Sequence, residues 1–430
     1  MTPERNWFGQ PRGLTILVLT EMWEIFSYYG MRSLLVYYMT KQPMIDQEKS
    51  SLIYGTYTAM AYFTPIIGGV ISDRWLGKRR AVIIGGAIMA AGHFMMAFEP
   101  LLYAALATIA IGNGLFLPSL PSQINDLYRS DDPRRSWAYN VYYVGINIGG
   151  FLAPLICGTL GEFYGWNWGF GAAGVGMLLG LAIYVLGGKY LPEQGRVEQR
   201  KPDSEPVRDG RSTGLLLLAV ALAVTIFRSA YEQVGNTVAL FADAGIDRTT
   251  PWMTIPMTWF QALNPLLVIM MTPALLAHWR NRAAAGRVLS STRKMAFGAL
   301  IVAAAYLGLA LIAATAADDR ASWLWLAAFF VVFTLGELYI LPVGLGLFAR
   351  LAPPSFGATT VAAWFFATFT GSLAAGFVGA LWSRISHPVF FAVLAAIAAL
   401  AAALLLALDG STRRIESVRA DGVLQSSPAS

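Results

Sequence analysis

The sequence has few of the residues on which soluble proteins and many enzymes depend. Only 13% of the 430 residues are charged, and there are one cysteine and three histidines. A single cysteine excludes an internal disulfide, and His93, His278 and His387 are too far apart in the sequence to suggest a metal motif. Neither a phosphate-binding lysine loop nor a nucleophile elbow occurs. We therefore expect no metal, no cofactor and no enzymatic activity.

Apolar residues dominate instead. They make up 56% of the chain, together with 42 glycines, and this composition does not describe soluble domains. A net charge of +6 in a soluble protein would suggest a nucleic-acid partner. Here the basic residues fall mainly between apolar segments, so we expect membrane topology to explain them and expect no nucleic-acid partner.

Twelve apolar runs are long enough to cross a bilayer, because about 30 Å of hydrocarbon at 1.5 Å per residue needs roughly 20 apolar residues. The predicted spans are 13–39, 51–73, 79–98, 101–124, 136–161, 166–190, 212–241, 252–278, 293–316, 321–348, 355–383 and 387–408. The first run holds charged residues and no cleavage site follows it, so we expect it to remain as a helix. The sequence predicts an all-α membrane protein.

The basic residues predict the orientation. When the connections are assigned to alternate sides, all but seven of the 31 lysines and arginines lie on the side of the N-terminus. Five lie opposite and two lie within spans: Lys41, Lys49, Arg248, Arg320 and Arg384, then Arg32 and Arg228. By the positive-inside rule both termini are cytoplasmic, in a multi-pass protein of the inner (plasma) membrane.

The longest connection predicts the domain organisation. It is rich in charged residues and proline and divides the spans six to six, which is the plan of transporters built from two six-helix halves. We expect an N-terminal six-helix bundle at 1–191, a cytoplasmic linker at 192–211, a C-terminal six-helix bundle at 212–410 and a cytoplasmic tail at 411–430.

Six acidic or basic residues other than histidine lie in the interior of the predicted spans, away from their ends. They are Glu21, Glu24, Arg32, Arg228, Glu232 and Glu337. Each charge costs about 2.5 to 3.5 kcal/mol at the centre of a membrane helix, which favours a polar cavity or ion pairs over contact with lipid. They belong to the first, seventh and tenth spans, which are equivalent in a four-repeat plan and line its central cavity.

One face of the first span carries Glu21, Glu24, Tyr28 and Arg32. Two acids one turn apart repel and burial disfavours their charged form, so at least one is expected to bind and release a proton. The alternative is that the charges form neutralised pairs that hold helices together, above all in the seventh span.

Polar and aromatic residues at membrane depth are further candidates. They are Tyr28, Tyr29, Tyr142, Tyr143, Trp259, Trp364, Asn147 and Asn264. The aromatic rings either line a cavity or pack against neighbours, and the asparagines either contact a substrate or bond carbonyls freed at helix kinks. The sequence leaves both alternatives open.

Motifs in both halves resemble one transporter family. Residues 11–35, PRGLTILVLTEMWEIFSYYGMRSLL, are similar to the first helix of the proton-dependent oligopeptide transporters, a branch of the major facilitator superfamily, which carries E-x-x-E-R-F-x-Y-Y-G. Further resemblances follow in family order: GGVISDRWLGKRR at 68–80, YYVGINIG at 142–149, Glu232-Gln233, WFQALNP at 259–265, GELYILPVGL at 336–345 and Trp364-Phe365. The resemblance implies the major facilitator fold of two six-helix bundles.

The resemblance also implies peptide uptake by alternating access. It assigns proton coupling to Glu21 and Glu24, to which we add Glu232. Our expected substrate-binding set is Tyr28, Tyr29, Arg32, Tyr143, Asn147, Arg228, Asn264, Glu337 and Trp364. In the family the position of Arg32 and a lysine of the fourth helix address the peptide carboxylate, and the position of Glu337 addresses its amino group. The expected gating residues are Asp73, Arg74 and Arg80.

Two positions depart from the family pattern. The arginine of E-x-x-E-R is Ile25 here, and the lysine of G-x-G-x-x-K-P is Leu117. We hypothesise that Arg228 replaces part of the lost positive charge. The six charges then sum to four negative and two positive, which suits cations, amines or protonated carboxylates.

Two functions follow from these observations. The first is a monomeric carrier in the lipid bilayer that imports small peptides or peptide-like solutes with protons. The alternative is an exporter, or a carrier of another organic solute such as a siderophore, amine or drug, with altered or absent proton coupling. The apolar Ile25 and Leu117 are the feature that favours the alternative.

Overall fold

The computed structural model describes residues 9–128, 132, 134–192, 210–316, 319–351 and 357–416, with the backbone alone at 136, 210–212 and 357–362. The chain forms two compact units, and each is described by itself. Unit 1 takes Met1–Glu198 and Val234–Ile269, and unit 2 takes Gln199–Gln233 and Met270–Ser430. Residues 193–209 of the predicted linker and 417–430 of the predicted tail lie outside the described residues.

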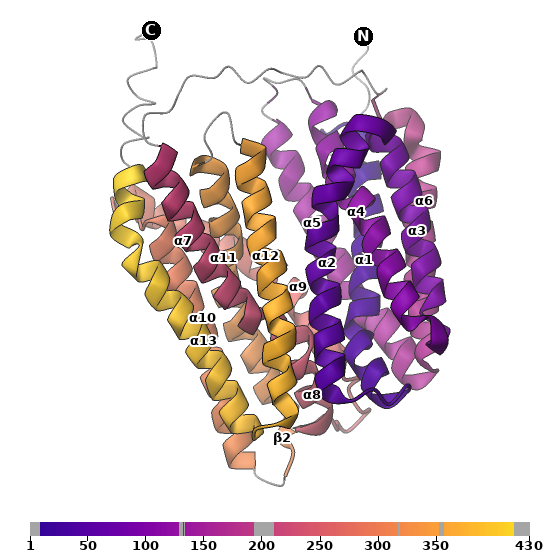
Figure 1. Ribbon diagram of the computed structural model, residues 1–430, viewed down its shortest axis with the longest axis vertical. Helices are drawn as coiled ribbons and strands as arrows, with labels where there is room; N and C mark the ends of the chain where they lie inside the picture. Colours follow the sequence, from indigo (N-terminus) through magenta and orange to yellow (C-terminus); the bar gives the residue numbers. More distant parts are fainter. Residues whose placement is uncertain are drawn as a thin grey trace. The chain divides into compact units, whose positions relative to one another are not determined.

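Unit 1 is a bundle of long helices in which α1 packs against α5 and α6, and α4 packs against α2 and α3 (Figure 1). Its long helices are α1 (Arg12–Lys41), α2 (Gln47–Ile71), α3 (Lys78–Met95), α4 (Leu102–Asp126), α5 (Arg134–Phe163) and α6 (Trp166–Leu186). Its shorter elements are η1 (Ser72–Leu76), η2 (Glu99–Leu101), η3 (Gly187–Tyr190), α8 (Thr237–Ala244) and β1 (Ile246–Asp247), and it also takes the beginning of α9 (Trp259–Ala284).

Unit 2 contains the remaining helices, in which α10 packs against α11 and α13, and α7 packs against α12 and α13. Its helices are α7 (Gly210–Tyr231), α10 (Ser291–Ala316), α11 (Trp323–Leu351), α12 (Gly357–Gly379) and α13 (His387–Ala407), with the rest of α9. The short elements are η4 (Glu232–Gly235), which the unit boundary divides, η6 (Ala380–Ser383) and β2 (Ala321–Ser322).

Each of the twelve predicted spans coincides with a helix, but two of them differ in detail. The seventh is interrupted, since α7 ends at Tyr231 and α8 resumes at Thr237 after η4. The predicted start of the eighth at residue 252 is wrong: α9 begins at Trp259. Thr249 and Thr254 form an isolated bridge there, and Pro256 has no amide hydrogen to donate to a helix.

Nine helices in the described ranges are long and apolar enough to cross a membrane by composition alone. The three that fall short of this criterion are α1, α2 and α3. Of these, α1 is 30 residues long, and its apolar character is reduced by Glu21, Glu24 and Arg32. Charge, and not length, separates α1 from the nine.

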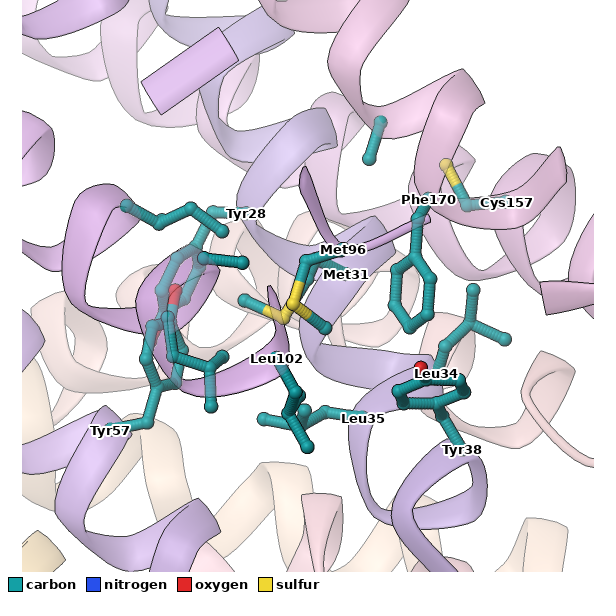
Figure 2. Close-up of a cluster of buried hydrophobic side chains, with 14 of the residues drawn as sticks. Tyr28, Met31, Leu34, Leu35, Tyr38, Tyr57, Met96, Leu102, Cys157 and Phe170 are labelled. Atoms are coloured by element: carbon teal, nitrogen blue, oxygen red, sulfur yellow. The ribbon is translucent and has the colours of Figure 1, made fainter. Parts of the chain in front are cut away.

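A cluster of buried side chains holds the lower half of unit 1 together (Figure 2). Met31 and Met96 both belong to it, Tyr38 packs edge-on against Phe170 with ring centroids 5.1 Å apart, and Tyr28 stacks on Tyr57 at 6.2 Å. Aromatic and thioether side chains fill irregular space between helices well. The cluster fixes the position of α1, which carries Glu21, Glu24, Tyr28, Tyr29 and Arg32.

Glycines allow α5 to approach α1 at backbone distance. A Cβ atom on Gly149 would collide with the carbonyl oxygen of Met22, and one on Gly145 would lie 2.7 Å from a methyl carbon of Val18. Small residues at such crossings replace the hydrophobic driving force that a membrane interior lacks. The sequence of α5 therefore sets how closely the acidic face of α1 can be enclosed.

Gly149→Val should destabilise the protein because the added side chain forces α5 away from Met22. Overpacking of this kind typically costs about 1 to 3 kcal/mol. Gly171→Val is the matched control, since a Cβ on Gly171 of α6 would meet nothing within 4 Å. Thermal unfolding of the purified proteins should show a lower midpoint for Gly149→Val alone, and equal midpoints would contradict the packing argument.

Candidate functional site

Two carboxylates are buried side by side in α1. Glu21 and Glu24 are each only 2% exposed, and the Oε2 atom of each has no hydrogen-bond partner among the described residues. Tyr142 of α5 lies next to Glu21, but its hydroxyl group is outside hydrogen-bond geometry. No cation among the described residues forms an ion pair with either acid. Protonation would remove a charge that the site leaves uncompensated.

Ile25, at the position where the family resemblance predicts an arginine, is half-buried. A Cβ on Gly150 of α5 would lie 3.9 Å from Ile25 and 3.4 Å from Pro265 of α9. Isoleucine thus takes part in packing and supplies no charge to the acids.

Arg32 and Tyr28 occupy an aromatic cluster on the same helix. The Arg32 Nε atom donates a 2.7 Å hydrogen bond to the Tyr54 hydroxyl, and its guanidinium lies 5.6 Å from the ring centres of both Tyr29 and Tyr54. Tyr28 meets Tyr29 edge-on at 5.6 Å. The predicted side chains Tyr28, Tyr29 and Arg32 are therefore brought together, with Tyr54 of α2 as an addition that the sequence analysis did not include.

The polar candidates of α5 and α9 are placed differently. Asn147 is buried and donates its amide to the Tyr143 carbonyl at 2.8 Å, one turn earlier in α5. This contact lies within α5 and does not decide between the two alternatives for the asparagine. Tyr143 is 41% exposed, and Asn264 is half-buried near the beginning of α9. Trp259 donates a hydrogen bond to the Thr159 hydroxyl at 2.8 Å, which joins α9 to α5.

The predicted gating loop is an exposed π-helical turn. Asp73, Arg74 and Arg80 are exposed, and none of them forms an ion pair with another described residue. The contacts of this loop come from Lys78, which pairs with Asp126 at the end of α4 at 2.7 Å, and from Ser72, which accepts from Ser119 at 2.9 Å. The family motif thus identified the loop, but it did not identify Lys78 and Ser72 as the side chains that bind the loop to α4.

The segment 234–269 lies over α1, α2 and α5 within unit 1, at the end where α1 meets α2. Glu162 of α5 accepts a hydrogen bond from Arg248 at 2.9 Å and one from the backbone N–H of Met257 at 2.8 Å. Asp243 of α8 pairs with Lys41 at 2.6 Å and with Arg248 at 3.4 Å. We call Glu162, Arg248, Asp243 and Lys41 the closing network.

Hydrogen bonds of uncharged groups extend the same contact. The Tyr37 hydroxyl donates to the Ala239 carbonyl at 2.7 Å, and Ser51 of α2 donates to the Asn236 side chain at 3.0 Å. Gln261 donates to the Ser33 carbonyl at 3.2 Å. The segment is thus fastened to three helices of unit 1 by polar contacts.

In unit 2, Arg228 and Glu232 form a buried ion pair. They are 5% and 1% exposed, and Arg228 Nη2 donates to Glu232 Oε1. Ser372 of α12 donates to the same oxygen at 3.4 Å. A Cβ on Gly371 would collide with the Arg228 side chain, so this glycine makes room for the arginine. Within unit 2 the positive charge of Arg228 is matched by Glu232.

Tyr231 links this pair to Glu337. The Arg228 guanidinium lies 4.9 Å from the centre of the Tyr231 ring, and the Tyr231 hydroxyl donates to Glu337 Oε1 at 2.8 Å. Three charges, from α7, η4 and α11, therefore belong to one polar cluster of unit 2. The sequence analysis missed Tyr231, although it directly precedes Glu232 and lies one turn after Arg228.

Trp364 is part of the packing of unit 2. It is buried and meets Phe348 of α11 edge-on, with ring centroids 5.4 Å apart. In the described ranges no group of three His, Cys, Asp or Glu side chains is close enough to hold a metal ion. Each unit thus carries one charged and aromatic cluster of candidate residues.

Comparison with known proteins gives a consistent picture. A family model described as the POT family matches residues 79–207 and 205–394. An uncharacterized transporter, YclF of Bacillus subtilis (strain 168), is 30% identical over 475 residues, which cover 96% of this chain and 96% of YclF. A di-/tripeptide transporter of Lactococcus lactis subsp. cremoris is 29% identical, covering 91% of this chain and 93% of that protein.

The fold has a close counterpart among solved structures. The crystal structure of a peptide transporter POT in complex with sulfate has a TM-score of 0.88 and 28% identity, covering 96% of this chain and 97% of the other. The predicted all-α membrane fold of the major facilitator type is thereby confirmed.

Arg228→Gln should destabilise the protein strongly because Glu232 would remain as an unpaired buried charge. Breaking a buried pair costs about 3 to 5 kcal/mol, whereas replacing both partners costs less. We therefore expect the double variant Arg228→Gln/Glu232→Gln to unfold at a higher temperature than Arg228→Gln alone. Strictly additive changes in unfolding midpoint would show that the two side chains are not coupled.

Proposed function

The chain belongs to the POT family, and we propose that it imports small peptides or peptide-like solutes together with protons by alternating access. The observation that carries this proposal is the pair of buried acids in α1, Glu21 and Glu24, each with an oxygen that lacks a partner among the described residues. An intramembrane carboxylate that no cation neutralises is a functional-site candidate by default. The di-/tripeptide transporter named above supports peptides as the substrate class.

The chain is a multi-pass protein of the inner membrane, as its apolar helices and its bacterial relatives indicate. We propose that both termini are cytoplasmic, on the distribution of lysine and arginine. The end of unit 1 that carries the closing network is then on the opposite, outer side. We propose a monomer without enzymatic activity, with 1–191 and 212–410 as the two bundles that move.

We propose that charged side chains address the two ends of the peptide. Arg32 offers a guanidinium for the peptide carboxylate, and Glu337 offers a carboxylate for the amino group. Arg32 is held by Tyr54 and Glu337 by Tyr231, so neither side chain has to be ordered by the substrate. Such preorganisation reduces the entropy cost of binding.

Proton and peptide must each favour one conformation over the other if their transport is coupled. Protonation of Glu21, Glu24 or Glu232 changes a buried charge, and in this scheme it biases which side is open. Glu232 differs from the other two because Arg228 already neutralises it. We therefore assign the main coupling role to the α1 acids.

The exporter or other-solute alternative receives no support from the relatives named above. Ile25 and Leu117 remain the residues on which it would rest. One experiment distinguishes proton-coupled peptide import from this alternative.

Proteoliposomes with an alkaline interior should accumulate labelled dialanine. Glu21→Gln/Glu24→Gln should lower this accumulation by roughly 5-fold or more, the range of a typical coupling energy, while gradient-independent exchange persists. Glu99→Gln, an exposed acid of η2, is the control. Undiminished accumulation in the double variant would remove the α1 acids from coupling, and absence of uptake in the unaltered protein would leave the alternative.

Glu162→Gln should weaken closure on the outer side, because the closing network loses a charged acceptor for Arg248 and a hydrogen bond to Met257. Spin labels at the exposed positions Gln42 and Trp252 should then report a larger share of long distances. The control is again Glu99→Gln, which removes a carboxylate from the same end without touching the network. Unchanged distance distributions would exclude Glu162 as part of the closure.

A further inference from the structure

An apolar groove lies between α10 and α11 of unit 2, at the end where the connection 317–322 joins them. Its volume is about 640 Å³. Most of its lining is aliphatic or aromatic, from Ala304, Gly308, Leu311 and Ile312 on α10 to Trp325, Ala328, Phe329 and Val332 on α11. Nothing in the transport scheme above uses it.

The groove exists because the two helices diverge. At one end they touch through their backbones, since a Cβ on Gly298 would lie 2.5 Å from the Gly336 carbonyl oxygen. Ten residues later, roughly 15 Å along the axis, a Cβ on Gly308 would meet nothing within 4 Å. Small residues at Ala304 and Gly308 leave this space unfilled.

The walls are suited to hydrocarbon. Leu311 is 66% exposed and Trp325 57% exposed, and both belong to helices that are long and apolar enough to span the membrane. Apolar surface of this kind in a membrane helix is solvated by acyl chains. A water-soluble solute would gain no hydrogen bond from these walls.

The mouth of the groove has a different chemistry. Arg320 is the one charged side chain among the described lining residues, and it forms no ion pair or hydrogen bond with another described residue. Ser322 accepts from the Leu324 N–H at 3.4 Å, which leaves its own hydroxyl hydrogen available. Trp323 and Trp325 begin α11 at this level, where tryptophan marks the membrane–water interface.

We propose that this groove binds one anionic phospholipid, with an acyl chain between α10 and α11 and its phosphate at Arg320 and Ser322. An unpaired arginine at headgroup depth attracts anionic lipids. A chain lying in the groove fills the space that Gly308 leaves open. Charge at the mouth and hydrocarbon along the walls match the two parts of one lipid molecule.

Native mass spectrometry of the full-length protein with added phosphatidylglycerol or phosphatidylethanolamine tests the proposal. The unaltered protein should retain one phosphatidylglycerol. Gly308→Leu should lose retention of both lipids, because its side chain fills the groove, while Gly171→Leu in the open space beside α6 should bind as before. Arg320→Gln should weaken phosphatidylglycerol about fivefold and phosphatidylethanolamine by a smaller factor, because the ammonium group of the latter offsets its phosphate charge. Arg384→Gln, an exposed cation in the connection to α13, is its control.

Location is checked with a phosphatidylglycerol that carries a photoreactive group in its acyl chain. Cross-links should map to 304–332 in the unaltered protein and disappear in Gly308→Leu. If Gly308→Leu does not fold, Ala304→Phe fills the same groove one turn away. The proposal would be overturned if lipid retention and cross-linking were unaffected in both groove variants, or if a second protein molecule occupied the groove. If the lipid preference of Arg320→Gln were unchanged, the headgroup site would be overturned.

Discussion

The cost of holding an ionised side chain inside a membrane bundle is the constraint on which the candidate site depends. Unit 2 meets this cost with a partner, since Arg228 and Glu232 neutralise each other and Ser372 adds a hydrogen bond. Unit 1 encloses Glu21 and Glu24 with no cation from the described residues. A paired charge has little reason to change its protonation state, whereas an unpaired one is relieved by a proton. Unit 2 thus holds a neutralised ion pair, whereas unit 1 holds the acids that are suited to exchange a proton.

Glycine makes both arrangements possible. Gly149 lets α5 close over the face of α1 that carries the acids, and Gly371 gives Arg228 room to reach Glu232. At Gly308, by contrast, no neighbouring side chain or backbone lies close to the glycine, and a groove remains. How closely two helices of this protein approach each other therefore depends on whether a glycine at that position contacts the neighbouring helix.

The sequence alone predicted the helices well because each span is an apolar run of bilayer length. It failed at the start of α9, where apolar Trp252 and Met253 precede Pro256 and the chain folds as a turn. Candidate residues could be chosen where a charge at membrane depth is conspicuous, as for Arg228 and Glu337. Tyr231 was missed because a tyrosine beside an acid looks like packing until its hydroxyl is seen on a carboxylate of another helix. Tertiary contact of this kind leaves no periodic signal.

The five cations on the proposed outer side were treated only as exceptions to the orientation rule, and the structure gives four of them a specific setting. The rule counts lysine and arginine and ignores acids, so it cannot reveal that Lys41 and Arg248 pair with Asp243 and Glu162. Arg320 stands at the mouth of the large apolar groove. Lys49 lines a second groove, of about 390 Å³, between α2 and α4. The positive-inside rule disfavours lysine and arginine on the proposed outer side. Ion pairing and contact with lipid headgroups are two local interactions that would favour keeping such a residue there.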